Sequence, residues 1–314
     1  MEHIELSIVI PCYNEGKNVY LLYQRIKEAM RKIGKSYEII YVDDGSHDDT
    51  LKYLKKVKNI APNKTVIVKL RKNFGQTAAL DAGFKQAKGK VFITMDGDLQ
   101  NDPADIPKLL KKMATGYDVV SGWRHARRDP FGKKIFSKMA NSLRKSLTKE
   151  KIHDSGCSLK AYKRECFEDL NLYGEMHRYI PAILMWKGYR IGEVKVKHYA
   201  RKYGKTKYNS IRLFKGFMDL LVVKFWMQFS GRPMHLFGGL GAIVSFLGFI
   251  IGLYLVYLKI FYKAGIMNRP LLLLVILLLI IGVQFLMFGI FGDILIKTYY
   301  DQKPGSSYSI EKIM

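Results

Sequence analysis

The sequence VFITMDGDLQ, residues 91–100, decides how the rest of the chain is interpreted. Five mostly apolar residues lead directly into Asp96, Gly97 and Asp98, and Gln100 follows. The apolar run predicts a buried strand, and in an open α/β sheet ligands bind at the carboxyl ends of such strands. Two carboxylates and an amide oxygen at this spacing are hard oxygen ligands that suit Mg²⁺ or Mn²⁺. An acidic turn that merely ends a strand is the alternative, and the neighbouring segments decide between the two.

The first 120 residues alternate between strand and helix patterns. Pro11 is expected to end the first strand, and Ser46 or the acidic residues after it are expected to cap the second helix. Alternation at this spacing predicts a doubly wound, mainly parallel α/β sheet. The expected strands are 5–10, 37–42, 65–70, 91–95 and one from 118, and the expected helices are 19–33, one from 50, and 77–87.

Polar side chains follow three of these strands. Tyr13 and Glu15 come after the first, Asp43 and Asp44 end the second, and the acidic cluster of residues 96–100 ends the fourth. Because parallel strands share one carboxyl edge, these side chains are expected to meet there and form a nucleotide site. Any one cluster fits an ordinary strand-to-helix turn, but three together argue for a site. Neither a G-x-G-x-x-G fingerprint nor a Walker loop occurs in the sequence.

The last third of the chain has a different composition. Residues 236–258 and 271–296 are nearly uncharged apolar runs, and both exceed the roughly 20 residues that span a bilayer. Buried core helices are the alternative, but they rarely stay apolar on every face for so long. We therefore expect two membrane spans joined by a loop at 259–269, with both ends on one side. The first strand has no charged leader, so we expect no signal peptide.

The net charge of +25 implies an anionic partner. Between residues 124 and 164 thirteen cations face three acids, and most of these lysines are expected to lie on anionic lipid. A strongly basic chain is commonly interpreted as a nucleic-acid-binding protein. The two expected membrane spans argue against this, and so does the lack of aromatic residues interspersed among the basic ones, on which bases would stack. The three cysteines have no metal-like spacing and fit buried positions in a reducing compartment. We therefore expect an integral membrane protein whose catalytic part is cytoplasmic.

Four segments in order resemble the family-2 glycosyltransferases of the GT-A fold: SIVIPCYNEGKNV, YEIIYVDDGSHDDT, LRKNFGQTAALDAGF and MDGDLQNDPADIP. The chain is most similar to the dolichol-phosphate mannose synthase and polyprenyl-phosphate glycosyltransferase branch, over residues 4–208. The resemblance implies that Asp96, Asp98 and Gln100 hold Mg²⁺ or Mn²⁺ and the donor diphosphate. This branch more usually has alanine at Gly97. The residues expected to bind the nucleotide are Pro11, Tyr13, Glu15, Asp43, Asp44, Asp96 and Gly97.

The resemblance also includes basic residues, which in this family lie where the acceptor of the sugar binds. Arg124 matches a G-x-R after the fifth strand, and Arg178 matches an R-x-x-P segment. Arg201 and Lys207 match an R-x-x-G-x-x-K-Y loop, and Asp154 lies in a segment where it would position the sugar, orient an arginine or end a turn. With Asp96 and Asp98, these four cations are the expected catalytic residues.

The acceptor is expected to be a phosphate carried by a lipid. Transfer to a hydroxyl needs a general base, whereas a phosphate oxygen is already anionic and needs only orientation by cations. The Q-x-x-R-W segment of processive polysaccharide synthases is missing. Residues 209–232 alternate apolar and basic side chains, which indicates an interfacial amphipathic helix or, alternatively, a docking helix of the soluble part.

The sequence thus predicts an inverting, metal-dependent transferase that moves a sugar from a GDP- or UDP-sugar to dolichyl or undecaprenyl phosphate. Transfer to a hydroxyl of a glycolipid or polysaccharide is one alternative, and a non-catalytic nucleotide-sugar-binding protein is another. The glycines 238, 239 and 241 would allow close packing in a homo-oligomer. The predicted parts are a GT-A domain at 1–208, the interfacial helix at 209–232, two spans at 233–297 and a cytoplasmic tail at 298–314.

Overall fold

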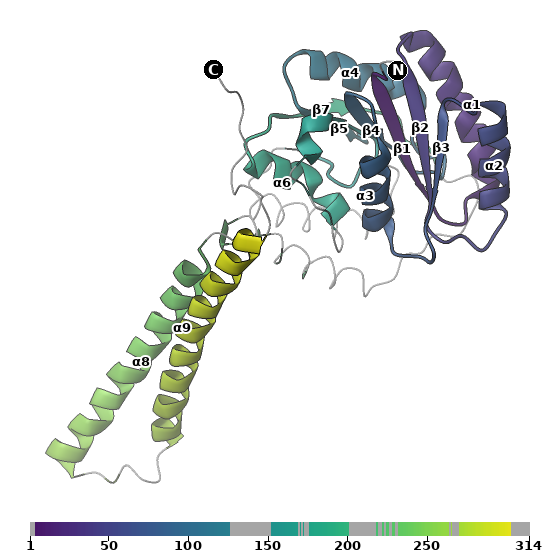
Figure 1. Ribbon diagram of the computed structural model, residues 1–314. Helices are drawn as coiled ribbons and strands as arrows, with labels where there is room; N and C mark the ends of the chain where they lie inside the picture. The colour runs from purple at the N-terminus through teal and green to yellow at the C-terminus, as the bar shows by residue number, and fades with distance from the viewer. Residues whose placement is uncertain are drawn as a thin grey trace. The chain divides into compact units, whose positions relative to one another are not determined.

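The computed structural model divides the chain into two compact units, Met1–Val223 and Lys224–Met314 (Figure 1). The predicted boundaries at residues 208, 232 and 297 stay predictions. The structure describes residues 4–125, 152–168, 170, 172, 176–200, 218, 222, 224, 225, 228, 229, 232–263, 265 and 270–302.

One mixed sheet of seven strands forms the centre of the first unit. The strands are β1 (Leu6–Cys12), β2 (Tyr37–Asp43), β3 (Thr65–Lys69), β4 (Val91–Thr94), β5 (Val119–Trp123), β6 (Lys160–Lys163) and β7 (Ile191–Lys195). Their order across the sheet is β3-β2-β1-β4-β6-β5-β7. The pairs β1–β2, β1–β4, β2–β3 and β5–β7 are parallel, whereas β6 runs antiparallel to both of its neighbours.

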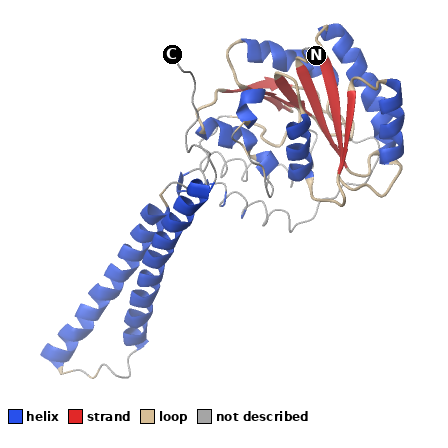
Figure 2. Cartoon of the chain, in the orientation of Figure 1, coloured by secondary structure: helices blue, strands red, loops and turns tan. Residues whose placement is uncertain are grey.

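Helices cover both faces of this sheet, as Figure 2 shows. They follow the strands in the alternating order that the sequence predicted, so the mainly parallel α/β fold is confirmed. The helices are α1 (Gly16–Ile33), α2 (Thr50–Ile60), α3 (Gln76–Gln86), α4 (Ile106–Ala114) and α6 (Ile180–Trp186), with short 3₁₀ turns η1 (Pro103–Asp105), η2 (Arg164–Phe167) and η3 (Met176–Arg178).

Side chains of β1 alternate between two buried faces. Ile8 and Ile10 belong to the same core cluster as Leu22 of α1. Val9 lies toward α3, where a Cβ on Gly83 would collide with the Val9 side chain, so the glycine allows the helix to approach. β1 is therefore buried on both faces, as is usual for a central parallel strand.

Two expectations about the sheet were wrong. Pro11 does not end the first strand: β1 continues to Cys12, and Pro11 pairs in register with Val42. β4 pairs with β1 only as far as Val9, so the proline lies beyond the part that is paired on both sides, where a missing N–H is tolerated. The sequence patterns also missed β6 and β7, and with them the antiparallel pairing in the middle of the sheet.

The second unit contains α8 (Pro233–Tyr262) and α9 (Pro270–Gln302), which pack along each other. A Cβ on Gly241 would lie 2.6 Å from the Gly282 carbonyl oxygen, and one on Gly289 would lie 2.7 Å from the Met234 sulfur. The glycines therefore allow close helix packing. Both helices are long and apolar enough to cross a bilayer, which indicates membrane association.

Two further expectations concern the chain around these helices. The loop predicted at 259–269 starts too early, because α8 continues to Tyr262. The interfacial helix expected at 209–232 lies largely outside the described residues. The same is true of most of the basic run between residues 126 and 151, and of residues 303–314.

Candidate active site

The loops that follow β1 and β2 are joined into one structure at the carboxyl edge of the sheet. The Asn14 amide donates to the Ser46 hydroxyl at 2.9 Å, and the Glu15 amide donates to Thr50 Oγ1 at 2.8 Å. Asp48, which precedes the N-cap residue Asp49 of α2, accepts from the Thr50 amide at the first position of the helix at 2.9 Å, whereas the Asp49 side chain makes no cap hydrogen bond. Ser46, one of the predicted caps, instead connects the two loops. Side chains expected to hold a nucleotide are thereby fixed relative to one another.

Backbone strain is found at two non-glycine residues of this edge. Asn14 has φ +57° and Leu99, between the metal-motif residues, has φ +65°. Asparagine tolerates the left-handed region, but a buried leucine there costs about 1–2 kcal/mol. Strain of this kind persists where the surrounding structure enforces it and is concentrated at functional sites.

Asp43 and Asp44 have different surroundings. Asp43 is fully buried, and its Oδ1 accepts from the Ser46 amide at 3.0 Å. Within the described part of the chain, its Oδ2 has no hydrogen-bond partner. Asp44 uses both oxygens on the loop before α3, accepting from the amides of Phe74 at 2.7 Å and Gly75 at 3.0 Å. Asp43 Oδ2 is therefore a buried acceptor without a partner among the described residues, whereas Asp44 holds a loop.

The predicted nucleotide and metal motifs touch at Gly97. A Cβ on Gly97 would lie 3.2 Å from the Cys12 sulfur, 3.4 Å from the Pro11 carbonyl oxygen and 3.7 Å from Glu15 Cγ. The loop after β1 thus lies against the acidic turn after β4. An alanine here, as is more usual in the branch, would need Cys12 to shift by a few tenths of an ångström.

Asp96 and Asp98 form a largely buried carboxylate pair at the end of β4. Asp98 is only 4% exposed, and its Oδ1 accepts from the Gln100 amide at 3.1 Å. Asp96 Oδ1 accepts from Gln76 Nε2 at 2.8 Å. Burial, and then the charge of Asp98, raise the pKa of Asp96. The pair is therefore electrostatically unfavourable when both carboxylates are ionised.

The donor set fits a hard divalent cation. A cation beside Asp96 and Asp98 would offset both the burial and the repulsion that raise the pKa of Asp96. Gln100 donates its amide nitrogen to the Tyr199 carbonyl oxygen at 3.2 Å, and its amide oxygen accepts no hydrogen bond from the described residues. No group of three or more His, Cys, Asp or Glu side chains that could hold a metal occurs in the described ranges. The ligands available to a cation are thus two carboxylates and one amide oxygen, a set that suits Mg²⁺ or Mn²⁺.

The first turn of α3 connects the metal motif to the predicted acceptor segment. Gln76 contacts Asp96, and the next residue, Thr77, hydrogen-bonds His177 Nδ1 through its hydroxyl at 2.7 Å. His177 in turn lies 3.4 Å from Arg178 Nε. This segment of α3 belongs to one of the four segments that carry the family resemblance, but its sequence pattern predicted no role for Gln76. A polar side chain at the first position of a helix facing the metal motif was the available signal.

Arg124 lies on the basic side of the site, paired with Asp154. Arg124 Nε and Nη2 donate to the two Asp154 oxygens at 2.7 and 2.8 Å, and the two side chains are 12% and 14% exposed. Burial is the largest single influence and acts to lower the pKa of Arg124, but the hydrogen bonding to Asp154 and the negative charge of Asp154 together outweigh it, and the net shift is upward. Of the alternatives for Asp154, the structure favours orienting an arginine.

Segment 197–200 is fixed to the metal motif. The Tyr199 amide donates to the Gln100 carbonyl oxygen at 2.9 Å, and the Lys197 amide donates to Asp105 Oδ2 at 2.6 Å. Arg201 and Lys207, which follow, lie outside the described residues. The loop expected to carry them thus starts beside Gln100.

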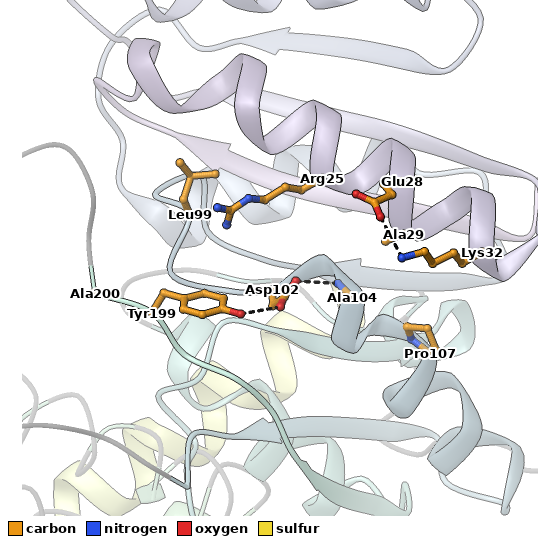
Figure 3. A pocket seen from close by; sticks show the side chains of 10 residues that line it. All are labelled: Arg25, Glu28, Ala29, Lys32, Leu99, Asp102, Ala104, Pro107, Tyr199 and Ala200. Carbon is orange, nitrogen blue, oxygen red and sulfur yellow. Dashed lines mark hydrogen bonds and ion pairs between the residues drawn. The ribbon is translucent and has the colours of Figure 1, made fainter.

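A pocket of about 590 Å³ lies next to this segment, on the α1 side of the metal motif (Figure 3). Its charged side chains balance, because Arg25 and Lys32 face Glu28 and Asp102. It contains none of the predicted site residues, although Leu99 of its lining lies between Asp98 and Gln100. Its lining is Arg25, Glu28, Ala29, Lys32, Leu99, Asp102, Ala104, Pro107, Tyr199 and Ala200.

The carboxyl edge of this mainly parallel α/β sheet thus brings together two joined loops, a largely buried carboxylate pair and the Arg124–Asp154 ion pair. Residues 7–170 match the family model Glycosyl transferase family 2, and the chain belongs to this family. It is therefore a glycosyltransferase, and the predicted family is confirmed.

Curated relatives match over nearly the whole chain. Dodecaprenyl-phosphate galacturonate synthase of Rhizobium johnstonii is 41% identical, over 100% of this chain and 94% of that protein. Undecaprenyl-phosphate 4-deoxy-4-formamido-L-arabinose transferase of Proteus mirabilis is 33% identical, over 99% of this chain and 94% of that protein.

Solved structures share the fold. Glucosyl-3-phosphoglycerate synthase from Mycobacterium tuberculosis, crystallised with Mn²⁺ and UDP-glucose, superposes with a TM-score of 0.55 at 17% identity. The match covers 73% of this chain and 81% of that chain. The first unit thus has the GT-A architecture that the sequence predicted.

Proposed function

We propose that this glycosyltransferase moves a sugar from a nucleoside diphosphate donor to the phosphate of a polyprenyl lipid, which makes a lipid-linked sugar. The observation that carries the proposal is the pair of full-length relatives, both named for transfer to a polyprenyl phosphate. The match covers 94% of each relative and includes the two long apolar helices of this chain.

The acidic edge is proposed to bind the donor. Asp96, Asp98 and Gln100 would hold Mg²⁺ or Mn²⁺, which when bound neutralises charge on the leaving diphosphate. Gln76 holds the Asp96 carboxylate from the side of α3. Asp43, whose second carboxylate oxygen has no partner among the described residues, is proposed as a further part of the nucleotide site. Pro11, Tyr13, Glu15, Asp44 and Gly97 complete the proposed nucleotide site.

The basic side is proposed to bind the acceptor phosphate. A phosphate oxygen is already anionic, so the reaction needs cations that orient it rather than a base that removes a proton. Asp154, the carboxylate next to Arg124, is fully engaged by that arginine, so it is not available as a base. Arg124, Arg178, Arg201 and Lys207 are the proposed orienting cations.

The two long apolar helices fit an acceptor that is carried in a bilayer. We propose that both helices span the membrane and that the catalytic unit is cytoplasmic, where nucleotide sugars are made. A lipid phosphate then reaches the enzyme laterally, and only the sugar donor comes from solution.

The test uses the full chain in lipid nanodiscs with Mn²⁺ and undecaprenyl phosphate. GDP-mannose, UDP-glucose, UDP-N-acetylglucosamine and UDP-galacturonate are offered in turn, and release of nucleoside diphosphate and glycosylated lipid are both measured. The proposal expects release with at least one donor that stops when undecaprenol replaces the phosphate. Transfer to glycolipid hydroxyls but not to undecaprenyl phosphate would refute it, as would nucleotide binding without turnover.

A further inference from the structure

A buried lysine and a largely buried glutamate lie on either side of the strand that leads to Arg124. β5 is flanked by β6 and β7, and Ser121 of β5 pairs in register with Lys160 on one side and Glu193 on the other. Side chains paired directly across a sheet share one face. Lys160 is 4% exposed, and the Glu193 side chain is 12% exposed. A cation and an anion thus lie in one row, separated by Ser121.

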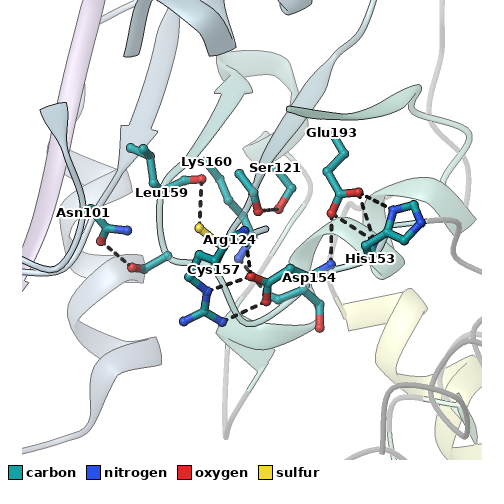
Figure 4. Close-up of polar contacts among 12 residues, drawn as sticks. Asn101, Ser121, Arg124, His153, Asp154, Cys157, Leu159, Lys160 and Glu193 are labelled. Carbon is teal, nitrogen blue, oxygen red and sulfur yellow. Dashed lines mark hydrogen bonds and ion pairs between the residues drawn. The ribbon is translucent and has the colours of Figure 1, made fainter. Parts of the chain in front are cut away.

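Both charges contact the backbone of the same loop (Figure 4). Glu193 Oε1 accepts from the amides of His153 and Asp154, both at 2.9 Å, and its Oε2 lies 2.7 Å from His153 Nδ1. The Lys160 ammonium donates to the Ser155 carbonyl oxygen at 3.0 Å. The Glu193 carboxylate therefore holds two backbone N–H groups of the loop, and the Lys160 ammonium holds one backbone carbonyl group.

Asp154 is the residue between these two contacts, and it determines where Arg124 points. Its carboxylate accepts both guanidinium hydrogen bonds of the bidentate pair. Gly156 leaves room for this pair, because a Cβ there would lie 3.1 Å from Arg124 Nη2. The orientation of Arg124 is thus set by the loop, and the loop is set by Lys160 and Glu193.

Stability alone does not explain two buried charges at this place. Buried ionic groups are costly to desolvate, and well-packed apolar residues of similar size are often as stable or more stable. Burial also lowers the pKa of Lys160, which reflects the same cost. Apolar side chains, however, could not form hydrogen bonds with the backbone amides and carbonyl of residues 153–155.

We propose that Lys160 and Glu193 are positioning residues that aim Arg124 at the acceptor phosphate through the loop of residues 153–155. Neither residue is hydrogen-bonded to Arg124 within the described part of the chain, so their effect is indirect. The inference rests on the proposed function for the identity of the acceptor, but not for the coupling of Glu193 to Arg124.

The first experiment measures the loop directly and needs no activity. Hydrogen exchange of the amides of His153 and Asp154 is compared in nanodiscs between the unaltered enzyme, Glu193→Gln and Glu165→Gln. Glu165 is the matched control: its side chain is 54% exposed and pairs with Lys163 at 3.4 Å, away from the loop. Exchange should accelerate about tenfold in Glu193→Gln and stay unchanged in Glu165→Gln. Unchanged exchange in Glu193→Gln would overturn the proposal.

The second experiment is a double-mutant cycle of Glu193→Gln with Arg124→Met. We expect Glu193→Gln to raise the acceptor KM about tenfold, to leave the donor KM within twofold, and to have no further effect when Arg124 is already Met. Equal effects in both backgrounds, or an equal rise in the donor KM, would show a merely structural role. If Glu193→Gln folds poorly, Glu193→Asp replaces it in the same cycle, since it keeps the charge but shortens the reach. If the proposed function itself is wrong, the result is different: the unaltered enzyme then transfers no sugar to undecaprenyl phosphate.

Discussion

The half of the sheet formed by β1–β4 and the half formed by β5–β7 differ in how far their charged side chains are compensated by neighbouring charges. In the first, the acidic half, Asp96 accepts from Gln76 and Asp98 accepts from the Gln100 amide, but burial and the neighbouring carboxylate still raise the pKa of Asp96. In the second, the basic half, the charges of Arg124 and Asp154 compensate each other. The acidic half is therefore electrostatically incomplete without a cation, whereas the basic half is complete and contributes orientation. Substitutions in the two halves should thus have different kinetic signatures.

The largest effect is expected from Asp98→Ala in the acidic half. Loss of a metal ligand removes several kcal/mol of charge stabilisation, so transfer should fall on the order of 1000-fold or more. The measurement is initial rate at saturating Mn²⁺, with Asp81→Ala as the control. Asp81 pairs with Lys85 on α3, outside the site. If Asp98→Ala retains full activity at saturating Mn²⁺, the acidic half does not hold the metal through this residue.

A smaller effect of a different kind is expected from Asp154→Asn in the basic half. The variant loses a charged partner of Arg124, and hydrogen bonds to charged groups contribute about 1.5–3 kcal/mol, so the acceptor KM should rise roughly 10- to 100-fold. The donor KM and the Mn²⁺ requirement should stay unchanged. A parallel rise in the donor KM would remove the proposed distinction between the halves.

A third effect tests the partner of Asp96. Gln76→Ala removes the side chain that donates to its carboxylate, and losing such an outer contact of a metal ligand costs about 10-fold or somewhat more in metal affinity. The Mn²⁺ concentration for half-maximal activity should rise accordingly, with the maximal rate recovered at high Mn²⁺. Gln86→Ala, at the exposed end of the same helix, is the control. An unchanged Mn²⁺ requirement would show that Gln76 does not support the metal.

The smallest expected effect is a gain in stability. Because the pKa of Asp96 is raised in the folded state, the native protein binds this proton more tightly than the unfolded chain does. The contribution of Asp96 to folding stability is therefore fully present below the ordinary carboxyl pKa of about 3.9. It is lost as the pH rises from that value through the raised pKa of the folded state. At pH 7.5 without metal, Asp96→Asn should melt higher, by about 2–4 °C for each kcal/mol gained.

The control for this prediction is the metal itself. Mn²⁺ should raise the melting temperature of the unaltered protein and should have little effect on Asp96→Asn, because the variant lacks one of the paired carboxylates. Both are measured by circular dichroism in EDTA and in Mn²⁺. A lower melting temperature for Asp96→Asn in EDTA would show that the carboxylate pair is not a source of instability.

Much of the acidic half was predictable from local sequence. Its strands are short apolar runs, and the polar residues at their ends meet because parallel strands share one edge. The basic half was less predictable: β6 (KAYK) and β7 (IGEVK) carry charged side chains and no long apolar run. Their pairing depends on residues far along the chain, such as Ser121 with Lys160 and Glu193. Periodicity within a short window carries no information about such partners.

The site shows the same division. The neighbourhood of Gly97 and Glu15 followed from the topology and is found in the structure. The contacts of Asp44 did not, because its carboxylate holds the amides of Phe74 and Gly75 in a loop about 30 residues later. Gln76 and Glu193 were missed for the same reason, since each acts through a contact that only the folded chain creates. The predicted roles of the site residues stay predictions until the variants are measured.

The contact between Tyr199 and Gln100 has a mechanical consequence. Tyr199 is bonded to Gln100 through both its amide and its carbonyl group, and its phenol donates to Asp102. Ala200 is the last residue of this segment that the structure describes, on the path toward the apolar helices. A displacement of Tyr199 would therefore be transmitted through these hydrogen bonds to the turn that carries Asp98 and Gln100.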